Sequence, residues 1–164
     1  AQYYRDARIL TIYEGTTAIQ ANDLVGRKTL RDGGAVARAL LAEVGKTEAA
    51  LEARSEPAAR LMLAPLRQAS AALASAVDFV LANAASRPNA VFAAAVPYLL
   101  LAGTTLAGWQ MARALLASLD LRQEDPAFHD AKIATAQCYA LHKLSQAGGL
   151  AAVVLGSGEY EVQP

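Results

Sequence analysis

Cysteine, histidine and aromatic residues are scarce in this chain of 164 residues, which has one cysteine, two histidines and 6% aromatic residues. The single cysteine, Cys138, excludes an internal disulfide and fits a reducing compartment such as the cytoplasm. The two histidines, His129 and His142, have no partners at the spacing that a metal site requires. The sequence therefore predicts neither a disulfide framework nor a metal centre.

An excess of one charge is also lacking, since 15 lysines and arginines balance 15 aspartates and glutamates. Without a basic stripe for phosphate backbones, we do not expect this chain to bind nucleic acid. What the chain does have is 54% hydrophobic residues, mostly aliphatic and rich in alanine. That composition favours helices, and a chain of this length can bury one good core.

The most distinctive stretch surrounds Glu14, in the sequence Ile12-Tyr13-Glu14-Gly15-Thr16. A helical apolar pattern restarts directly after it, so Thr16 or Thr17 is expected to be the N-cap. A carboxylate there experiences two opposed effects, because the helix dipole favours its charged form and its apolar neighbours favour its neutral form. Glu14 is therefore either a tunable base or a structural acid that caps the helix or pairs with a nearby arginine.

The same stretch resembles the C-terminal helical segment of the flavin-dependent acyl-CoA dehydrogenases. The resemblance is carried by Arg-Asp-Ala-Arg-Ile at residues 5–9, Ile-Tyr-Glu-Gly-Thr at residues 12–16 and Ile-Gln at residues 19–20. It covers roughly residues 5–30. The chain beyond it resembles the extra helical domain that some larger members carry at their C-terminus.

The resemblance implies a role for each of five consecutive residues. Glu14 would be the catalytic base, Gly15 would approach the substrate thioester, and Thr16, Thr17 and Ala18 would contact the cofactor. The implied reaction is FAD-dependent α,β-dehydrogenation of an acyl-CoA. An electron-transfer flavoprotein as electron acceptor and a homo-oligomeric parent enzyme are implied as well.

A complete enzyme of this family needs an N-terminal helical domain and a β domain, for which this chain is too short. We therefore expect it to be the C-terminal part of a larger enzyme, and to be inactive and free of flavin when isolated. An alternative from another class is a helical bundle that serves as a structural or oligomerisation module, because the residues after Gly34 contain no polar cluster of their own.

The glycine pair Gly33-Gly34 is the clearest boundary in the sequence. We expect residues 1–32 to end the C-terminal helical domain of the enzyme and residues 157–164 to form a polar tail. Residues 33–156 are predicted to form an all-α, antiparallel bundle of about four main helices, separated by turns that contain proline. Ser55 and Asp125, each shortly before a proline, are the expected N-caps of two of these helices.

Four stripes of mostly apolar residues at helical spacing predict the buried faces of these helices. The first is Val36, Leu40, Val44, Thr47 and Leu51, and the second is Met62, Leu66, Ala69, Leu73, Ala76 and Val80. The third is Leu99, Ala102, Leu106, Trp109 and Leu116, with Gly103 and Gly108 allowing close helix approach. The fourth is Phe128, Ala131, Ala134, Cys138, Leu141 and Leu144, which makes Cys138 a buried and unreactive thiol.

Residues 88–112 contain no charged side chain, and this run is long enough to span a bilayer. A membrane helix is therefore an alternative to a buried central helix of the bundle. The polar residues within the run and its richness in alanine and glycine favour the bundle helix. Pro97 is expected to bend that helix or restart it.

Overall fold

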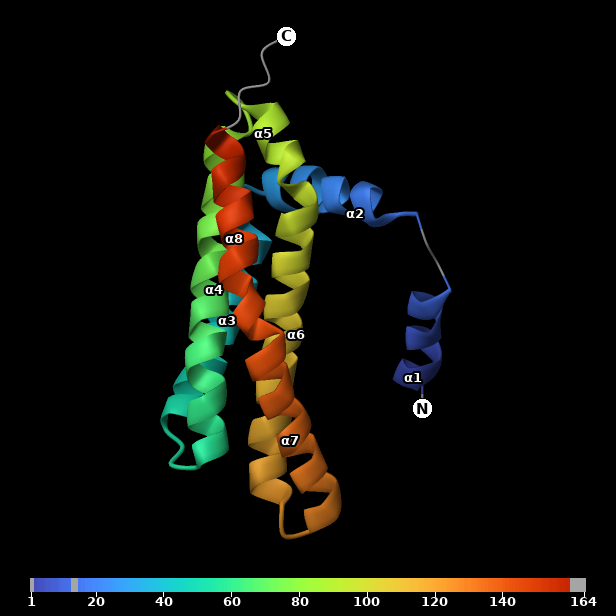
Figure 1. Cartoon of the computed structure of the whole chain (residues 1–164), viewed down its shortest axis with the longest axis vertical. Helices are drawn as coiled ribbons and strands as arrows, with labels where there is room; N and C mark the ends of the chain where they lie inside the picture. Colours follow the sequence, from blue (N-terminus) through green and yellow to red (C-terminus); the bar gives the residue numbers. More distant parts are fainter. Residues whose placement is uncertain (1, 13–14, 160–164) are drawn as a thin grey trace.

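The computed structural model describes residues 2–12 and 15–159, which are mostly helical and contain no strand. The bundle consists of α3 (Ala35–Glu52), α4 (Pro57–Asn83), α6 (Ala95–Leu121) and α7 (Pro126–His142), with α8 (Ala147–Gly156) continuing in the direction of α7 (Figure 1). Successive long helices run in opposite directions. The predicted all-α antiparallel bundle is confirmed.

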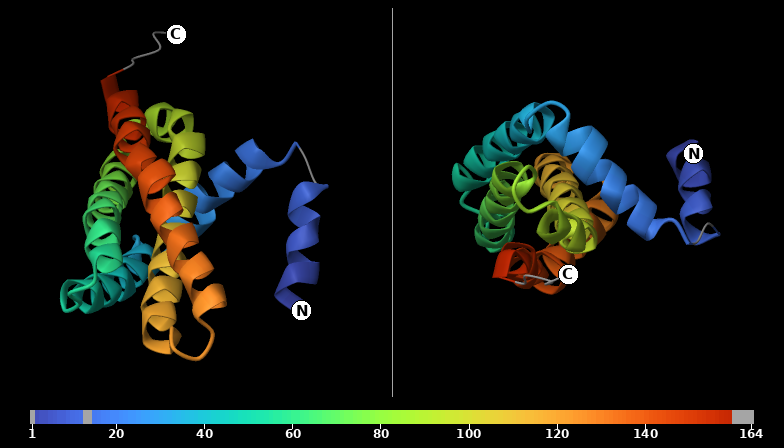
Figure 2. Two further views of the ribbon diagram at one scale, coloured as in Figure 1. Left: turned by 60° about the horizontal axis from the view of Figure 1, so that its bottom comes forward. Right: turned by 90° about the horizontal axis from the view of Figure 1, so that it is seen from above.

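Shorter helices precede and connect the long ones. The chain begins with α1 (Gln2–Ala7) and the 3₁₀ helix η1 (Arg8–Thr11), which lie apart from the bundle in both views of Figure 2. Helix α2 (Thr17–Asp23) leads directly into a π-helix, η2 (Leu24–Leu30), and crosses the bundle at one end. The remaining short helices are α5 (Pro88–Ala93), η3 (Leu144–Gln146) and η4 (Ser157–Glu159).

The turn at Gly33-Gly34 reverses the chain between η2 and α3. Both glycines have positive φ, 64° and 78°, a conformation that a side chain disfavours. Asp32 stabilises the turn, because its carboxylate oxygens accept hydrogen bonds from the backbone N–H groups of Gly34 (2.9 Å) and Val36 (3.0 Å). The glycine pair is therefore a tight turn between two helices, and its role as a domain boundary stays a prediction.

Helix α4 lies at the centre of the core together with α6. All six residues of its predicted stripe are buried, from Met62 to Val80, with at most 5% of any of them exposed. In α3, by contrast, Val44, Thr47 and Leu51 are buried as predicted, but Val36 is 60% exposed and Leu40 36% exposed. The prediction that these last two lie in the core is wrong, because they border a groove rather than a closed interface.

Helix α6 buries a face that is offset by one residue from the predicted one. Of the predicted stripe only Ala102 is buried, and Trp109 and the three leucines lie at the edge of the interface. The buried line includes Tyr98, Leu101, Thr105, Gly108, Ala112, Leu115 and Ser118. Because this line contains small and polar residues, apolar periodicity in the sequence does not identify it as the buried face.

The two glycines of α6 differ in role. A Cβ on Gly108 would lie 2.4 Å from Cδ2 of Leu144, so this position needs glycine for the close approach of the two segments. A Cβ on Gly103 would meet nothing within 4 Å, which corrects the expectation that it also permits close packing.

Side-chain hydrogen bonds connect α6 to its neighbours on three sides. The hydroxyl groups of Thr29 in η2 and Tyr98 in α6 lie 2.9 Å apart, and both side chains are buried. The indole Nε1 of Trp109 donates to Oγ1 of Thr47 in α3 (2.8 Å), and the hydroxyl of Tyr139 in α7 donates to the carbonyl of Thr104 (3.1 Å). These bonds fix how η2, α3 and α7 are placed around the central helix.

Helix α7 turns the opposite face to the core from the one predicted. Its buried residues are Ala136 and Ala140, and of the predicted stripe only Leu144, which lies in η3, is buried. The other predicted residues are exposed: Phe128, Ala131, Ala134, Cys138 and Leu141. The helix has apolar residues on both faces, and the smaller ones lie against α6 because they allow close approach. Cys138 is exposed as a result, which corrects the prediction of a buried thiol.

The starts of two helices test the predicted caps. Asp125 Oδ1 accepts a hydrogen bond from the backbone N–H of Phe128 (3.2 Å), as expected of an N-cap. Ser55 is not the N-cap of α4, because that helix begins one residue later, with Glu56 at the N-cap position and Pro57 as its first residue. The proline fixes the start of the helix, since its missing N–H costs nothing there.

The uncharged run of residues 88–112 forms α5 and the first two thirds of α6. A turn at Ala94 separates them, and Pro97 lies in the first turn of α6, so the helix restarts there as predicted. Within the described ranges, no helix combines the length and hydropathy needed to cross a membrane.

Candidate functional site

The predicted site lies at the N-terminal end of α2. Glu14, the predicted catalytic base, and Tyr13 fall outside the residues that the structure describes. Gly15 and Thr16 follow them, and α2 begins at Thr17. The structure therefore bears on the residues beside Glu14 rather than on Glu14 itself.

Gly15 has a φ of 75°, in the left-handed region. A Cβ built on it would contact nothing within 4 Å, so conformation rather than space makes glycine suitable here. The backbone at Gly15 is exposed. A ligand could approach it without displacing any described part of the chain.

Thr16 occupies the N-cap position of α2, as predicted, but its hydroxyl does not cap the helix. Its Oγ1 is buried and, among the described residues, has no hydrogen-bond partner. A buried hydroxyl without a partner costs about 1–3 kcal/mol relative to a satisfied one. This atom is therefore the clearest indication in the segment of a missing polar contact.

Thr17 and Ala18 lie in the first turn of α2 and are exposed. The first backbone hydrogen bond of the helix runs from the N–H of Gln20 to the carbonyl of Thr16 (2.9 Å). The N–H groups of Thr17 and Ala18 precede that bond, and the first amides of a helix have no partner within it. Both amides can donate to an acceptor placed at this end of the helix.

The end of α2 and the π-helix η2 that continues it pack against the bundle. Ala21, Val25 and Thr29 follow one another at intervals of four residues and are all buried, with no more than 1% exposed. The Thr29 hydroxyl bonds to that of Tyr98, and burial of Tyr98 raises the pKa of its phenol. The first turn of α2 is thus held rigidly while it extends beyond the bundle (Figure 2).

The segment before the site leaves many apolar side chains uncovered. In α1, η1 and the residue after it, Tyr3 is 92% exposed, Tyr4 76%, and Ile9, Leu10 and Ile12 between 55% and 74%. Large apolar side chains that are exposed together in one segment indicate contact with another surface. Within the described residues, no cluster of three or more His, Cys, Asp or Glu side chains could hold a metal ion.

A family model described as acetyl-CoA dehydrogenase C-terminal like matches residues 40–160, which is most of the chain. This chain belongs to the acyl-CoA dehydrogenase family. Among its relatives, 3-methylmercaptopropionyl-CoA dehydrogenase of Ruegeria pomeroyi is 49% identical over 142 residues, which cover 85% of this chain and 24% of that protein. The broad-specificity linear acyl-CoA dehydrogenase of Mycobacterium tuberculosis is 28% identical over 148 residues, again 85% of this chain and 24% of the relative.

The chain thus spans about a quarter of the length of these acyl-CoA dehydrogenases, and it corresponds to a C-terminal part of such an enzyme. The family implies a flavin cofactor. The residues at the start of α2 fit such a group, because Thr16 offers a buried hydroxyl without a described partner and the next two residues offer amide donors. The Thr29–Tyr98 pair that anchors this helix was not predicted, since its members are 69 residues apart and nothing local in the sequence connects them.

Proposed function

We propose that this chain carries the catalytic base of an FAD-dependent acyl-CoA dehydrogenase, and that the base is Glu14. The proposal rests on the arrangement at the N-terminal end of α2, where the buried and unpartnered Oγ1 of Thr16 lies next to exposed amide donors. Membership of the family supports it. The substrate is an acyl-CoA thioester and the reaction is α,β-dehydrogenation.

Glu14 removes the proton from the α carbon of the acyl group. An α C–H is far too weak an acid for a carboxylate in water, so the developing enolate oxygen must be held by hydrogen-bond donors. The backbone N–H of Glu14 is one such donor, and the exposed backbone of Gly15 leaves room for the thioester. When bound, FAD accepts the β hydrogen as a hydride.

The next three residues orient the cofactor. Thr16 donates its hydroxyl, and Thr17 and Ala18 donate the first two amides of α2, which have no partner within the helix. In the full-length enzyme the bound acyl chain excludes water from the site, and a carboxylate with less water around it is a stronger base.

The parent enzyme is proposed to be a homo-oligomer that passes electrons to an electron-transfer flavoprotein. The apolar side chains that α1 and η1 leave exposed support contact with further parts of the enzyme. Exposed Cys138, the single cysteine, supports residence in a reducing compartment such as the cytoplasm. The boundaries at residues 32 and 156 and the inactivity of the isolated chain remain predictions.

Glu14→Gln in the full-length enzyme tests this function. The amide keeps the shape and the backbone donor of Glu14 but cannot act as a base, so flavin reduction by substrate should slow at least ~100-fold. Flavin content and acyl-CoA affinity should stay close to parental. Glu43→Gln is the matched control, because Glu43 lies in α3 and pairs with Lys46 at the surface (2.5 Å). Parental reduction rates in Glu14→Gln would disprove the assignment.

A further inference from the structure

Helix α7 has an outer face that the rest of the bundle leaves uncovered. Ala136 and Ala140 pack against the core, and the residues on the opposite side of the helix are exposed. Phe128 is 53% exposed even with the Lys132 ammonium 5.4 Å from the centre of its ring, and Leu141 is 55% exposed. The outer face consists of Phe128, Ala131, Ala134, Thr135, Cys138 and Leu141. It contains no charged residue, and an exposed apolar face of this kind indicates contact with another surface.

The outer face has the same pattern in both directions along the helix. Its midpoint lies between Ala134 and Thr135, which are both of moderate size or small. Its two large apolar residues, Phe128 and Leu141, lie equally far from that midpoint, one toward each end. A face that reads alike in both directions fits a second copy of itself across a two-fold axis, with the two helices antiparallel.

Small residues occupy the centre line of this face. Ala131 and Cys138 are seven residues apart, which is close to two full turns, so they lie one above the other. They too lie equally far from the midpoint of the face. In an antiparallel pair, Ala131 of one helix is therefore opposite Cys138 of the other. Small side chains at these positions allow the two helix axes to come within about 8–10 Å.

The charges at the two ends of α7 are complementary. Glu124 lies just before the helix, and Lys143 directly follows its last residue. Both are exposed, and among residues 2–12 and 15–159 neither forms an ion pair. Arg122, in the same turn as Glu124, already pairs with Asp130 at 2.6 Å. In an antiparallel pair, the basic end of each helix lies beside the acidic start of the other.

The outer face of α7 lies apart from the segment that leads to the predicted site. In Figure 2, α1 and α2 leave the bundle on one side, whereas α7 and α8 lie on another. The exposed apolar side chains of α1 and η1 support contact with further parts of the enzyme on the first of these sides. This separation favours a second copy, rather than the rest of the same enzyme chain, as the occupant of the outer face.

We propose that the outer face of α7 binds the same face of a second copy of this chain, with the two helices antiparallel. The inference deepens the homo-oligomer proposed above by naming a contact surface, and it is independent of the role proposed for Glu14. One helix face per copy buries less than a standard interface, which covers about 800 Å² of each partner. The chain alone therefore associates weakly, and trapping by a disulfide is the suitable way to detect the pair.

Disulfide trapping tests the arrangement in the chain of 164 residues, where Cys138 is the single cysteine. Ala131→Cys places a thiol opposite Cys138 of the second copy, so oxidation by glutathione disulfide should link two chains through two disulfides. Within one chain the two positions are about 10.5 Å apart along the helix, too far for a disulfide. The unmodified chain should stay unlinked, because the two Cys138 side chains of an antiparallel pair are separated by the same distance.

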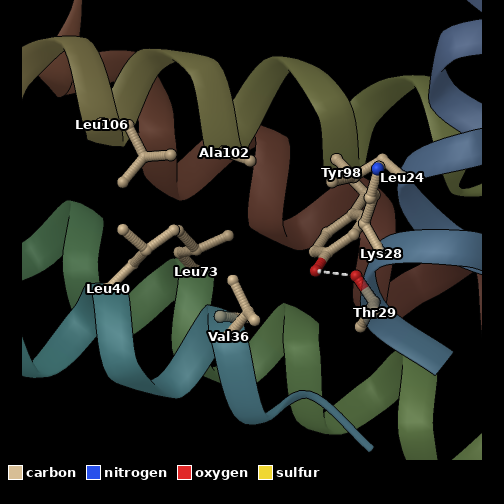
Figure 3. Close-up of a pocket in the computed structure, with 10 residues that line it drawn as sticks. Leu24, Lys28, Thr29, Val36, Leu40, Leu73, Tyr98, Ala102 and Leu106 are labelled. Carbon is tan, nitrogen blue, oxygen red and sulfur yellow. Dashed lines mark hydrogen bonds between the residues drawn. The ribbon is translucent and has the colours of Figure 1, made fainter. Parts of the chain in front are cut away.

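Two control positions make the test specific. Ala71→Cys adds a thiol at an exposed alanine of α4, and it should give far less linked dimer than Ala131→Cys. Added to Ala131→Cys, Leu141→Asp should slow linking at least ~10-fold, because a large apolar side chain is no longer buried. Val36→Asp should leave the rate unchanged. Val36 is 60% exposed and lines a groove of about 80 Å³ between η2, α3 and α6, which no residue of α7 lines (Figure 3).

Three outcomes would overturn the proposal. The first is linking of Ala131→Cys no faster than that of Ala71→Cys, in chains that circular dichroism shows to be folded. The second is rapid linking of the unmodified chain, since Cys138 would then lie opposite its own copy in a parallel pair. The third is linking in the chain but not between subunits of the full-length Ala131→Cys enzyme, mapped by mass spectrometry of its peptides, because other domains would then cover α7. None of these results depends on Glu14.

Discussion

The hydrogen-bonded pair of Thr29 and Tyr98 offers a sharp test of how the helix that carries the predicted site is anchored. Their hydroxyls lie 2.9 Å apart, with 1% of Thr29 and 2% of Tyr98 exposed. Tyr98→Phe removes one hydroxyl and leaves the other buried without its partner. The cost should be about 1–3 kcal/mol, the usual penalty for such a group.

Thr29→Val should cost about as much, because it leaves the phenol of Tyr98 unsatisfied in turn. The double variant removes both hydroxyls, so no buried hydroxyl is left without a partner. Its loss in free energy of unfolding should therefore be smaller than the sum of the losses in the two single variants. Urea denaturation followed by circular dichroism measures all four proteins. In a chain of this size, each kcal/mol also lowers the melting temperature by about 2–4 °C.

Tyr139→Phe is the matched control for this cycle. It removes a phenol whose hydroxyl donates to the backbone carbonyl of Thr104 at 3.1 Å, at a site that is only partly buried. Its cost should be about 0.5–1.5 kcal/mol, that of an ordinary hydrogen bond. If both single variants at the Thr29–Tyr98 pair were neutral, or if their losses were simply additive, this account of the anchor would be wrong.

Two further predictions concern packing and pH. Gly108→Ala should destabilise the chain by about 1–3 kcal/mol, because its Cβ would overpack against Leu144. Gly103→Ala should stabilise the chain by up to ~1 kcal/mol, because alanine has the higher helix propensity. In thermal melts the melting temperature should be lowest for Gly108→Ala and highest for Gly103→Ala. Burial raises the pKa values of Tyr98 and Tyr139 above their ordinary value of 10.0, so the unfolded chain releases these protons first. Stability should therefore be unaffected by these groups below about pH 10 and fall above it, less steeply in Tyr98→Phe, and an equal slope in that variant would contradict the assignment.

The sequence predicted the fold better than it predicted which helix faces are buried. Helix α4 is amphipathic in the usual way, and all of its predicted stripe lies in the core. Helix α7 has apolar residues all round, so periodicity could not distinguish Ala136 and Ala140, which pack, from Phe128 and Leu141, which do not. That choice depends on close approach to α6, a property of two helices rather than of one.

Of the candidate site, the helical pattern in the sequence predicted where α2 starts. The positive φ of Gly15 is a finding of the structure, and the roles of the site residues stay predictions. The sequence did not predict that the Thr16 hydroxyl would be buried without a described partner, or that Thr29 in η2 would bond to Tyr98 in α6. Contacts between residues far apart in sequence decide both features.

The central claim is that Glu14 removes the α proton of an acyl-CoA, and exchange of that proton with solvent tests it most directly. The full-length enzyme and its Glu14→Gln variant would each be incubated in D₂O with an acyl-CoA analogue that cannot lose its β hydrogen. NMR would then follow deuterium entering the α position. We predict exchange in the parent and at least ~100-fold slower exchange in the variant, with flavin content unchanged. Equal exchange rates in the two proteins would contradict the claim.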